Sequence, residues 1–443
     1  MAATKTAGSM GTPLEKFPEP VYDSAPIPKE RYLDPAFGEL ENERMWGRAW
    51  LYAGPSSDVA TLGAFLRFEI ANESILVVRA AEGAGGLRAF YNVCQHRGSQ
   101  LESEKTCGSA RRFVCPYHLW SYDLEGKLVH APDREDFPHG VAEGLRIPAV
   151  QVDEWNGLVF VNMDPEAEPL AEYLGAAGDH LLPYDFATNY HLAIDQTFEW
   201  PCNWKAGVDA FNEVYHVQGI HPELLDFTDD VDCPIDLLGK HSRFLFTVLR
   251  PSPRWTDEIA RARGLRDRYA LSDYVKSFVK QTGLDPEEYD DHRKLRPAMI
   301  ERTKELSAEY GLDVSALNDD QIYMDVHYQF FPNITFNISV QHFWLFRARP
   351  HPSGDPHRML WDFQEFRRKP SAMPAPERPV HMHHVWGDGS EKDVDLVLQQ
   401  DGNQAGPIQS GMRSRGFSGL NLAHQERRIR HFHAVLDQYL GGR

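Results

Sequence analysis

Two short pairs of cysteine and histidine constrain this chain more than any other feature of its sequence. Cys94 and His96 form a C-x-H pair, and Cys115 and His118 form a C-x-x-H pair, with eighteen residues between the pairs. Two such pairs on separate loops suit a cluster of two irons and two sulfides, in which the cysteines hold one iron and the histidines hold the other. Neutral imidazoles in place of two thiolates lower the negative charge around the cluster and raise its reduction potential. The pattern therefore predicts an electron-transfer centre.

Zinc is the alternative occupant for the same four residue types. Zinc fingers order their ligands as a cysteine pair followed by a histidine pair, whereas each pair here contains one residue of each type. Loop-type residues accompany both pairs, namely Arg97 and Gly98 after the first and Pro116 and Tyr117 inside the second. Ligand order and context favour the iron–sulfur cluster over zinc, and over a chance grouping among 5 Cys and 20 His.

The segments Asn92–Gly98 and Cys115–Trp120 resemble the Rieske domain of the ring-hydroxylating oxygenase α subunits. The chain departs from that pattern in two places: the gap between the pairs is slightly longer around Cys107 and Gly108, and Leu119 stands where a small residue is frequent. The resemblance implies a Rieske [2Fe-2S] cluster carried by loops of a small antiparallel β domain.

Length and composition predict a globular protein with more than one domain. The chain has 443 residues, of which 42% are hydrophobic. A net charge of −19 argues against sequence-independent nucleic-acid binding, which needs a basic face. We expect no membrane-spanning segment, and no signal peptide, because Met1–Lys5 begins a polar stretch. Three cysteines remain beyond the cluster pairs, so we expect free thiols and a cytoplasmic location.

The sequence divides into three predicted parts. Residues 1–49 form an N-terminal tail and a lead-in helix, residues 50–165 form the Rieske domain, and residues 166–443 form a catalytic domain. No internal repeat interrupts this order. The expected fold class is α+β, in which the small antiparallel Rieske domain precedes a larger helix-grip (START/Bet v1-like) domain with an antiparallel sheet flanked by helices.

Local patterns predict the main elements. Apolar β-type runs indicate strands in the first half of the chain, and an aromatic-rich stretch indicates a sheet later on. Apolar residues at helical spacing indicate two amphipathic helices. The expected strands cover Phe65–Phe68, Ile75–Val78, Leu158–Val161 and Ile322–Arg349, and the expected helices cover Leu271–Val279 and Asn421–Leu440.

A second constellation contains His216 and His221. Five positions correspond to about 500° on a straight helix, so the two rings would not share one face. The helix must loosen between them, which Gly219 permits, or the histidines must end on a turn. With one carboxylate added, they would form the two-histidine, one-carboxylate triad that binds Fe(II) and leaves positions open for dioxygen.

The surrounding residues match the catalytic-domain signature of the same oxygenase family. Asn203-Trp204-Lys205, Glu213-x-Tyr215-His216 and His221 carry the match, whereas Ala210 departs from a frequent Asn. The family places the third ligand, an acid, a few residues before a Gln and a Gly. The spacing to Gln400 and Gly402 selects Asp393, and the alternatives are Asp395, Glu391 and Asp388. The resemblance thus implies a mononuclear Fe(II) held by His216, His221 and Asp393.

Three further residues take expected roles from the same resemblance. Glu213, where the family more often has Asp, would accept hydrogen bonds from a catalytic histidine and from the partner subunit's His118, and so connect the two metal sites. Asp209 would lie near the open side of the iron. Asn333 would belong to a pocket strand that contacts substrate, or it would simply end a strand.

The resemblance implies the terminal oxygenase of a multicomponent system. Electrons would come from NAD(P)H through a separate reductase, with or without a ferredoxin, because no G-x-G-x-x-G follows a predicted strand. The expected reaction is O2-dependent ring dihydroxylation of an aromatic or other hydrophobic small molecule, and the alternative is monooxygenation or N/O-demethylation. The expected assembly is a homotrimer or an α3β3 complex with a small β subunit, in which the subunits form a closed head-to-tail ring. Rivals from other classes are a Rieske electron carrier without the second site and a zinc-stabilised binding module.

Overall fold

The computed structural model describes residue 22 and residues 25–323, 325–374, 376–389, 391 and 394–441. These residues form two compact units. The smaller unit contains Gly38–Tyr173, together with Pro352–Gly354 and Tyr439–Gly441. The larger unit contains Leu174–His351 and Asp355–Gln438, together with the described residues up to Phe37. Within the described residues, no helix is long and apolar enough to cross a membrane.

The smaller unit is built almost wholly from antiparallel strands. Its main sheet has seven strands in the order β2-β11-β10-β5-β4-β3-β6, and a second sheet has the order β7-β8-β9. The strands of the main sheet are β2 (Leu51–Pro55), β3 (Ala64–Ile70), β4 (Glu73–Arg79), β5 (Leu87–Tyr91), β6 (Cys107–Ser109), β10 (Ala149–Trp155) and β11 (Leu158–Asn162). Those of the second sheet are β7 (Phe113–Val114), β8 (Ser121–Tyr122) and β9 (Leu128–His130), and the short 3-10 turns are Ser56–Val59 and Arg134–Asp136.

One apolar cluster joins the two sheets of this unit. Phe65, Leu76 and Phe90 from the main sheet pack with Phe113 and Tyr122 from the small sheet. Cys94 and Cys115 belong to the same apolar cluster, so the core of the unit also fixes the two loops that carry these cysteines. The strands predicted at Phe65–Phe68, Ile75–Val78 and Leu158–Val161 are confirmed as parts of β3, β4 and β11.

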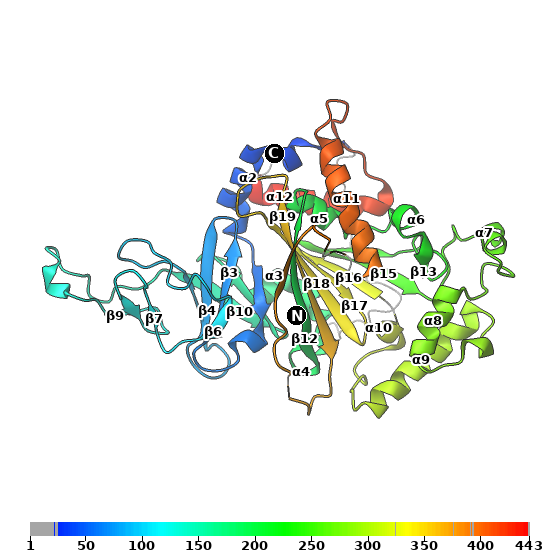
Figure 1. The fold of residues 1–443 in the computed structure, drawn as a ribbon, viewed down its shortest axis with the longest axis horizontal. Helices are drawn as coiled ribbons and strands as arrows, with labels where there is room; N and C mark the ends of the chain where they lie inside the picture. The colour runs from blue at the N-terminus through cyan, green and yellow to red at the C-terminus, as the bar shows by residue number, and fades with distance from the viewer. Residues whose placement is uncertain are drawn as a thin grey trace, which may run out of the picture. The chain divides into compact units, whose positions relative to one another are not determined.

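The larger unit is organised around one long, strongly aromatic sheet (Figure 1). Its strand order is β13-β15-β16-β17-β18-β19-β12-β20, with β14 paired to β15, and all pairs are antiparallel except β12 with β20. The strands are β12 (Tyr190–Trp200), β13 (Thr228–Asp229), β14 (Ile235–Leu238), β15 (His241–Val248), β16 (Asp325–Phe330), β17 (Ile334–Ile338), β18 (His342–Pro350), β19 (Met359–Arg368) and β20 (Met382–Val385), and a separate pair joins β1 (Ile27–Pro28) to β21 (Gly419–Leu420).

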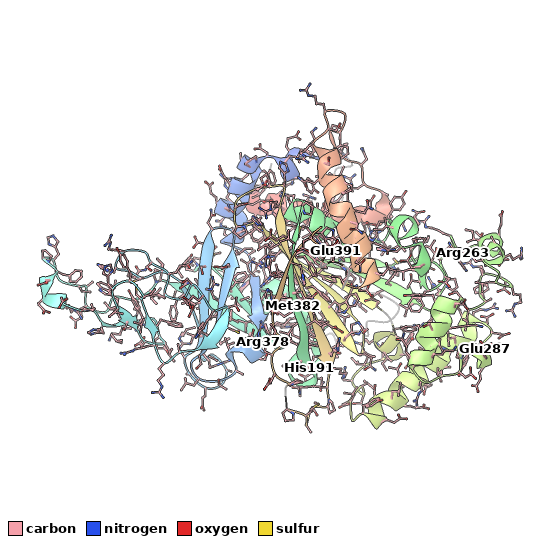
Figure 2. All side chains as sticks on the ribbon, in the orientation of Figure 1. His191, Arg263, Glu287, Arg378, Met382 and Glu391 are labelled. Atoms are coloured by element: carbon pink, nitrogen blue, oxygen red, sulfur yellow. The ribbon has the colours of Figure 1, made fainter. Side chains whose placement is uncertain are left out.

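Helices surround this sheet. The helix α5 packs against β18 and β19, and α11 packs against α5 and β12. Figure 2 places Arg263 and Glu287 on the side of α7 to α9, away from Met382 on the edge strand β20. The helices of the larger unit are α1 (Glu30–Leu33), α4 (Phe186–Asn189), α5 (Trp204–Ala210), α6 (Val217–Ile220), α7 (Asp257–Ala262), α8 (Asp273–Gln281), α9 (His292–Glu309), α10 (Asp319–Tyr323) and α11 (Leu396–Met412), with 3-10 turns at Leu182–Tyr184, Pro222–Leu224, Pro286–Glu288 and His424–Glu426. A π-helical turn (Asn42–Trp46) belongs to the smaller unit, and α2 (Pro35–Glu41), α3 (Leu170–Asp179) and α12 (Arg427–Leu440) each have residues in both units.

The predicted amphipathic helices are confirmed as α8 and α12. In α8, Val275 and Val279 are fully buried, and in α12 Ile429, Phe432 and Leu436 are buried at helical spacing. The predicted sheet at Ile322–Arg349 corresponds to β16, β17 and β18, although its first residues lie in α10. The expected α+β fold, with a small antiparallel β unit and a larger sheet flanked by helices, is confirmed.

Candidate metal centres

The two Cys/His pairs lie on neighbouring loops of the smaller unit. Cys94 and His96 follow β5, and Cys115 and His118 occupy the turn between β7 and β8. Each loop is closed by its own backbone: the amide of Cys94 donates to the carbonyl of Ser99 at 2.8 Å, and the amide of Cys115 donates to the carbonyl of Trp120 at 2.8 Å. Two tight turns therefore present the four side chains.

The four side chains converge in a way that fits a [2Fe-2S] cluster. The two cysteine sulfurs lie within hydrogen-bonding reach of each other. The imidazole rings of His96 and His118 lie 4.6 Å apart between centroids. Both Nδ1 atoms are shielded from solvent and have no hydrogen-bond partner within the part of the chain that the structure describes. Two paired sulfurs and two unpartnered ring nitrogens are the donor set that such a cluster requires.

The local electrostatics suit thiolate and neutral imidazole ligands. Burial raises the pKa of the Cys94 thiol, whereas amide hydrogen bonds from Tyr117 and His118 overcome burial and lower the pKa of Cys115. Burial and the neighbouring His118 lower the pKa of His96. The amides that solvate the cysteine sulfur would also stabilise the negative charge of a bound cluster.

The loop conformation explains one departure noted in the sequence. Leu119 has φ of 62°, in the left-handed region where a Cβ is strained. A small residue, above all Gly, relieves this strain, which accounts for the preference at this position. Gly98, on the other loop, has φ of 78°. Trp120 follows Leu119 and stacks on the ring of His96 with centroids 4.8 Å apart.

The second site begins at the two ends of α6. His216 is the N-cap residue of this helix, and His221 is its C-cap residue with φ −122° and ψ 50°. The prediction that the histidines end on a turn is confirmed, because the chain leaves the helix at His221. Their rings lie 5.2 Å apart between centroids, at 73° to each other. The turn thus brings together two rings that a straight helix would separate.

A carboxylate from α11 completes this group. Asp401 Oδ1 lies 3.0 Å from His221 Nε2 and 3.7 Å from His216 Nε2. Of the described residues, only His216, His221 and Asp401 form a group of three possible ligands whose atoms all lie within 4.8 Å of one another. The next residue, Gly402, lets α11 approach, because a Cβ there would lie 2.3 Å from the indole ring of Trp386.

Hydrogen bonds fix how both imidazoles point. His216 Nδ1 is bonded to a carboxylate oxygen of Glu213, and His221 Nδ1 lies 2.6 Å from Gln400 Oε1. Both bonds leave Nε2 as the nitrogen that faces Asp401. Outer partners of this kind set the tautomer and orientation of metal-binding histidines. The site residues therefore fit a mononuclear iron with two imidazoles and one carboxylate on one side.

The electrostatics of the group favour a bound cation. Burial alone lowers the pKa of His216, but the hydrogen bond and charge of Glu213 and the charge of Asp401 outweigh it and raise the pKa of His216. Asp401 is 8% exposed. A buried cluster of carboxylates with two imidazoles stabilises positive charge, which a metal ion supplies.

A cavity of about 270 Å³ opens beside the three ligands. Its walls are mainly aromatic and aliphatic, with Phe211, Phe244, Phe246 and Trp344 among them. Glu213, His216, His221 and Asp401 also line it. The cavity is large enough for a small organic molecule next to the ligand group.

The predicted third ligand, Asp393, lies outside the described residues. Asp395 lines the cavity, but its carboxylate caps α11 by accepting the Val397 amide at 2.9 Å. Glu391 accepts a hydrogen bond from the Gly389 amide and belongs to no group of possible ligands among the described residues. Sequence reasoning did not select Asp401. A signal was present, since Asp401 lies on the buried stripe of α11 with Leu398 and Ala405.

The structure does not bring Asp209 or Asn333 to the cavity. Asp209 Oδ2 accepts a hydrogen bond from the Tyr32 hydroxyl at 2.5 Å, and the same hydroxyl lies 2.7 Å from His433 Nε2. Asn333 is 1% exposed and donates to the carbonyl of Ala348 at 2.9 Å. Neither side chain is among those that line the cavity. These contacts connect helices and strands around the site, so neither expected role gains support from the geometry.

Family models match most of the chain. Residues 186–442, more than half of the chain, match the ring hydroxylating alpha subunit (catalytic domain), and residues 49–148 match the Rieske [2Fe-2S] domain. The first match contains the three ligand-forming residues of the larger unit, and the second contains both Cys/His pairs.

Individual proteins agree with these matches. The chain is 32% identical over 263 residues to the glycine betaine monooxygenase oxygenase subunit of Chromohalobacter salexigens, which covers 58% of this chain and 54% of that protein. It is 35% identical over 190 residues to the biphenyl 2,3-dioxygenase subunit alpha of Rhodococcus jostii, covering 42% and 41%. The chain thus spans about half the length of the curated relatives it matches. The crystal structure of a quaternary ammonium Rieske monooxygenase with L-carnitine shares the fold, with a TM-score of 0.65 at 20% identity over 94% of this chain and 95% of that one.

Proposed function

This chain belongs to the ring-hydroxylating alpha-subunit family, and we propose that it is the terminal oxygenase of a multicomponent Rieske system acting on a small organic substrate. The observation that carries the proposal is the convergence of His216, His221 and Asp401 on a cavity wall, in a chain that also contains the two Cys/His pairs. When bound, the mononuclear iron supplies dioxygen activation and the Rieske cluster supplies single electrons.

The residues of the site have separate tasks in this proposal. Asp401, rather than Asp393, provides the carboxylate ligand, since its Oδ1 faces both histidines. Glu213 and Gln400 hold His216 and His221 with Nε2 toward the cavity. The aromatic walls exclude water and position the substrate next to the ligand group.

Electrons would reach the site from NAD(P)H through a separate reductase, with or without a ferredoxin. In a closed ring of subunits, Glu213 would connect His216 to the partner subunit's His118. The contact between Glu213 and His216 supports one part of this connection, since Glu213 accepts a hydrogen bond from His216 within this chain. A homotrimer or an α3β3 complex would satisfy this arrangement.

Monooxygenation of a carbon next to nitrogen is the reaction we place first. It is supported by a relative named as a glycine betaine monooxygenase subunit and by the fold shared with a quaternary ammonium monooxygenase. One oxygen atom of O2 enters a C–H bond, and the other leaves as water with two electrons and two protons. A hydroxylated N-methyl group then loses formaldehyde when its C–N bond breaks. Ring dihydroxylation is the second candidate, and it is supported by the match to a biphenyl 2,3-dioxygenase subunit.

A single-turnover experiment tests the oxygenase proposal. Protein that carries about three irons per chain would be reduced chemically, mixed with substrate, and exposed to ¹⁸O-labelled O2. We expect about one dealkylated or singly labelled product per iron site from N-methylated compounds. Aromatic products with two ¹⁸O atoms would instead favour ring dihydroxylation. No product from either panel, in protein with both metal sites filled, would contradict the proposal.

A further inference from the structure

A second cavity of about 470 Å³ adjoins the one beside the metal ligands. The two cavities share five wall residues: Phe227, Val248, Asp325, Asn337 and Trp344. Beyond this junction the second cavity is lined by residues from α8, α9, α10 and the turn between β17 and β18. Its walls are part apolar, with Phe278, Leu306 and Ile322, and part polar, with Gln281, Thr303, Gln341 and His342 among the polar residues. The junction is therefore the place through which a substrate of more than a few atoms would extend away from the metal.

The sheet register brings the polar residues of the junction onto one face. Asn337 pairs with His327 on β16 and with Trp344 on β18. Asp325 lies two residues before His327, and its cross-strand neighbour on β15 is Phe246. Side chains at alternate positions of a strand share a face, so Asp325 and Asn337 both point toward the cavities. A carboxylate and an amide therefore lie among aromatic rings.

Polar atoms at the junction have no partner in the protein. Asp325 Oδ1 and Asn337 Oδ1 are shielded from solvent and accept no hydrogen bond within the described residues. The same holds for the indole nitrogen of Trp344 and the hydroxyl of Tyr323, which line the second cavity. Buried polar groups are normally satisfied, and a group of unsatisfied ones at a cavity wall indicates a ligand.

Asp325 also has no positively charged partner among the described residues. Burial raises the pKa of its carboxyl to about 7, and the Ile338 amide opposes that rise only in part. No Lys, Arg or His of the described chain contributes to its pKa. Asp325 is half-buried, and its Oδ1 atom is shielded from solvent. A carboxylate oxygen shielded without a cation is unfavourable, so we expect the partner of Asp325 to arrive with the ligand.

We propose that Asp325 recognises a positively charged ammonium or amine group of the substrate, with the Asn337 carbonyl and the rings of Phe246 and Trp344 beside it. An ammonium group is attracted to a carboxylate and to the faces of aromatic rings. The inference rests on the proposed oxygenase function, because the same cavity reaches His216 and Asp401. It adds a substrate class and a specificity-determining residue.

Binding to the metal-loaded holoenzyme, measured by anaerobic calorimetry, tests this inference. The probes are two matched pairs: choline with its neutral carbon isostere 3,3-dimethylbutan-1-ol, and benzyltrimethylammonium with neopentylbenzene. We expect the wild-type protein to bind at least one cation about tenfold or more tightly than its neutral match. Asp325→Asn should remove that preference and leave the affinity for the neutral probe within about twofold.

Asp226→Asn is the matched control. Burial also raises the pKa of Asp226, which is 3% exposed, but Asp226 lines a different cavity next to Trp255. We expect this variant to keep the cation preference. If Asp325→Asn does not fold, the two probe pairs on the wild-type protein still decide whether the cavity prefers a cation to its neutral match.

Three results would overturn the inference: no cation preference in either wild-type pair, including no cation binding at all; a preference that survives Asp325→Asn; or the same loss in Asp226→Asn. None of these results bears on oxygen insertion. A protein that ignores charge but labels a neutral product with ¹⁸O keeps the proposed function and loses the role of Asp325. A protein that binds cations through Asp325 but forms no product in the single-turnover experiment loses the function and keeps the binding site.

Discussion

The two candidate metal centres differ in how their ligands are brought together. The cluster ligands lie between Cys94 and His118, on two tight turns whose backbone hydrogen bonds are local. The iron ligands come from α6 and from α11, and Asp401 is 180 positions beyond His221. A short loop fixes the first site, whereas the packing of a distant helix fixes the second. The first site is thus readable from spacing, and the second depends on tertiary structure.

Exchanging the third ligand produces the largest expected effect. Asp401→Ala removes the carboxylate that faces both histidines, so we expect the mononuclear iron to be lost and product formation to fall by roughly 100-fold or more. The Rieske absorbance and EPR signal should persist, because no cluster ligand changes. The measurements are iron content per chain and single-turnover yield.

Asp393→Ala is the matched control for that experiment. If the geometry around Asp401 identifies the ligand, Asp393→Ala retains iron and activity. The reverse result, with iron kept in Asp401→Ala and lost in Asp393→Ala, would restore the choice made from the sequence.

The second effect concerns Glu213. Glu213→Gln keeps the size of the side chain but removes the charge that is bonded to His216, so we expect turnover to fall roughly 10- to 100-fold. Substrate affinity should change little. In Glu213→Asp, the residue more frequent in the family, we expect partial recovery. Stopped-flow reoxidation of the cluster separates a slow electron transfer from weak substrate binding.

Glu223→Gln serves as the control here. Glu223 is two residues after His221, but it lines neither of the two cavities near the metal ligands. It lines a third cavity, together with Asp226 and Trp255. A similar loss of turnover in both variants would show that the surface charge of this region, and not the bond to His216, is responsible.

Local features of this molecule were predicted from the sequence, whereas the third iron ligand was not. Apolar β-type runs predicted the strands β3 and β4, and helical spacing of apolar residues predicted the helices α8 and α12. His216 and His221 were predicted because they are near each other in sequence. Asp401 was missed because its role depends on how α11 packs, which Gly402 permits by leaving room for Trp386. No spacing rule contains that contact.

The same reason applies to Asp209 and Asn333. Both were given roles near the substrate from resemblance, yet their hydrogen bonds are to Tyr32 and Ala348. Asp325 had no sequence signal at all. It is the first residue of β16, where a polar residue is ordinary, and its importance follows from the cavity and from the absence of a positive partner among the described residues.

A smaller effect is expected in the pH dependence of stability. Because the pKa of Asp325 is raised to about 7 in the folded protein, the folded state holds its proton at pH values where the unfolded chain has lost it. Stability therefore decreases as pH rises from about 4 through about 7, by up to about 4 kcal/mol at 1.36 kcal/mol per pKa unit. Asp325→Asn lacks this decrease. About 3 kcal/mol of this change falls between pH 5 and pH 8, and the unfolding entropy of 443 residues is about 0.9 kcal/mol/K, so the advantage in Tm of the variant over the wild type should grow by roughly 3 °C over that range.

Other titratable groups near Asp325 do not produce the same trend. Burial raises the pKa of Tyr184 and Tyr323, and it lowers the pKa of His327 and His342. The two tyrosines stay protonated from pH 5 to pH 8, and the lowered pKa of the two histidines makes stability rise with pH, which is the opposite trend. All four groups are present in both proteins, so their contributions cancel in the comparison. A difference in Tm that stays constant with pH would mean that Asp325 is ionised throughout.

The smallest effect compares one glycine from each centre. Gly98, in the cluster loop, has φ of 78°, and a Cβ there would meet nothing within 4 Å, so Gly98→Ala has a purely conformational cost. We expect a loss of about 1–2 kcal/mol, because an L-residue is strained in the left-handed region. Gly219, between the iron histidines, also has open space but lies inside α6 without a positive φ. Gly219→Ala should therefore be neutral or stabilising by up to about 1 kcal/mol. Thermal melts of both variants measure the contrast. If Gly219→Ala is the costlier change, the segment between His216 and His221 needs a glycine for a reason that the helical geometry of α6 does not explain. Both metal centres would then depend on a local glycine, although their ligand spacings differ.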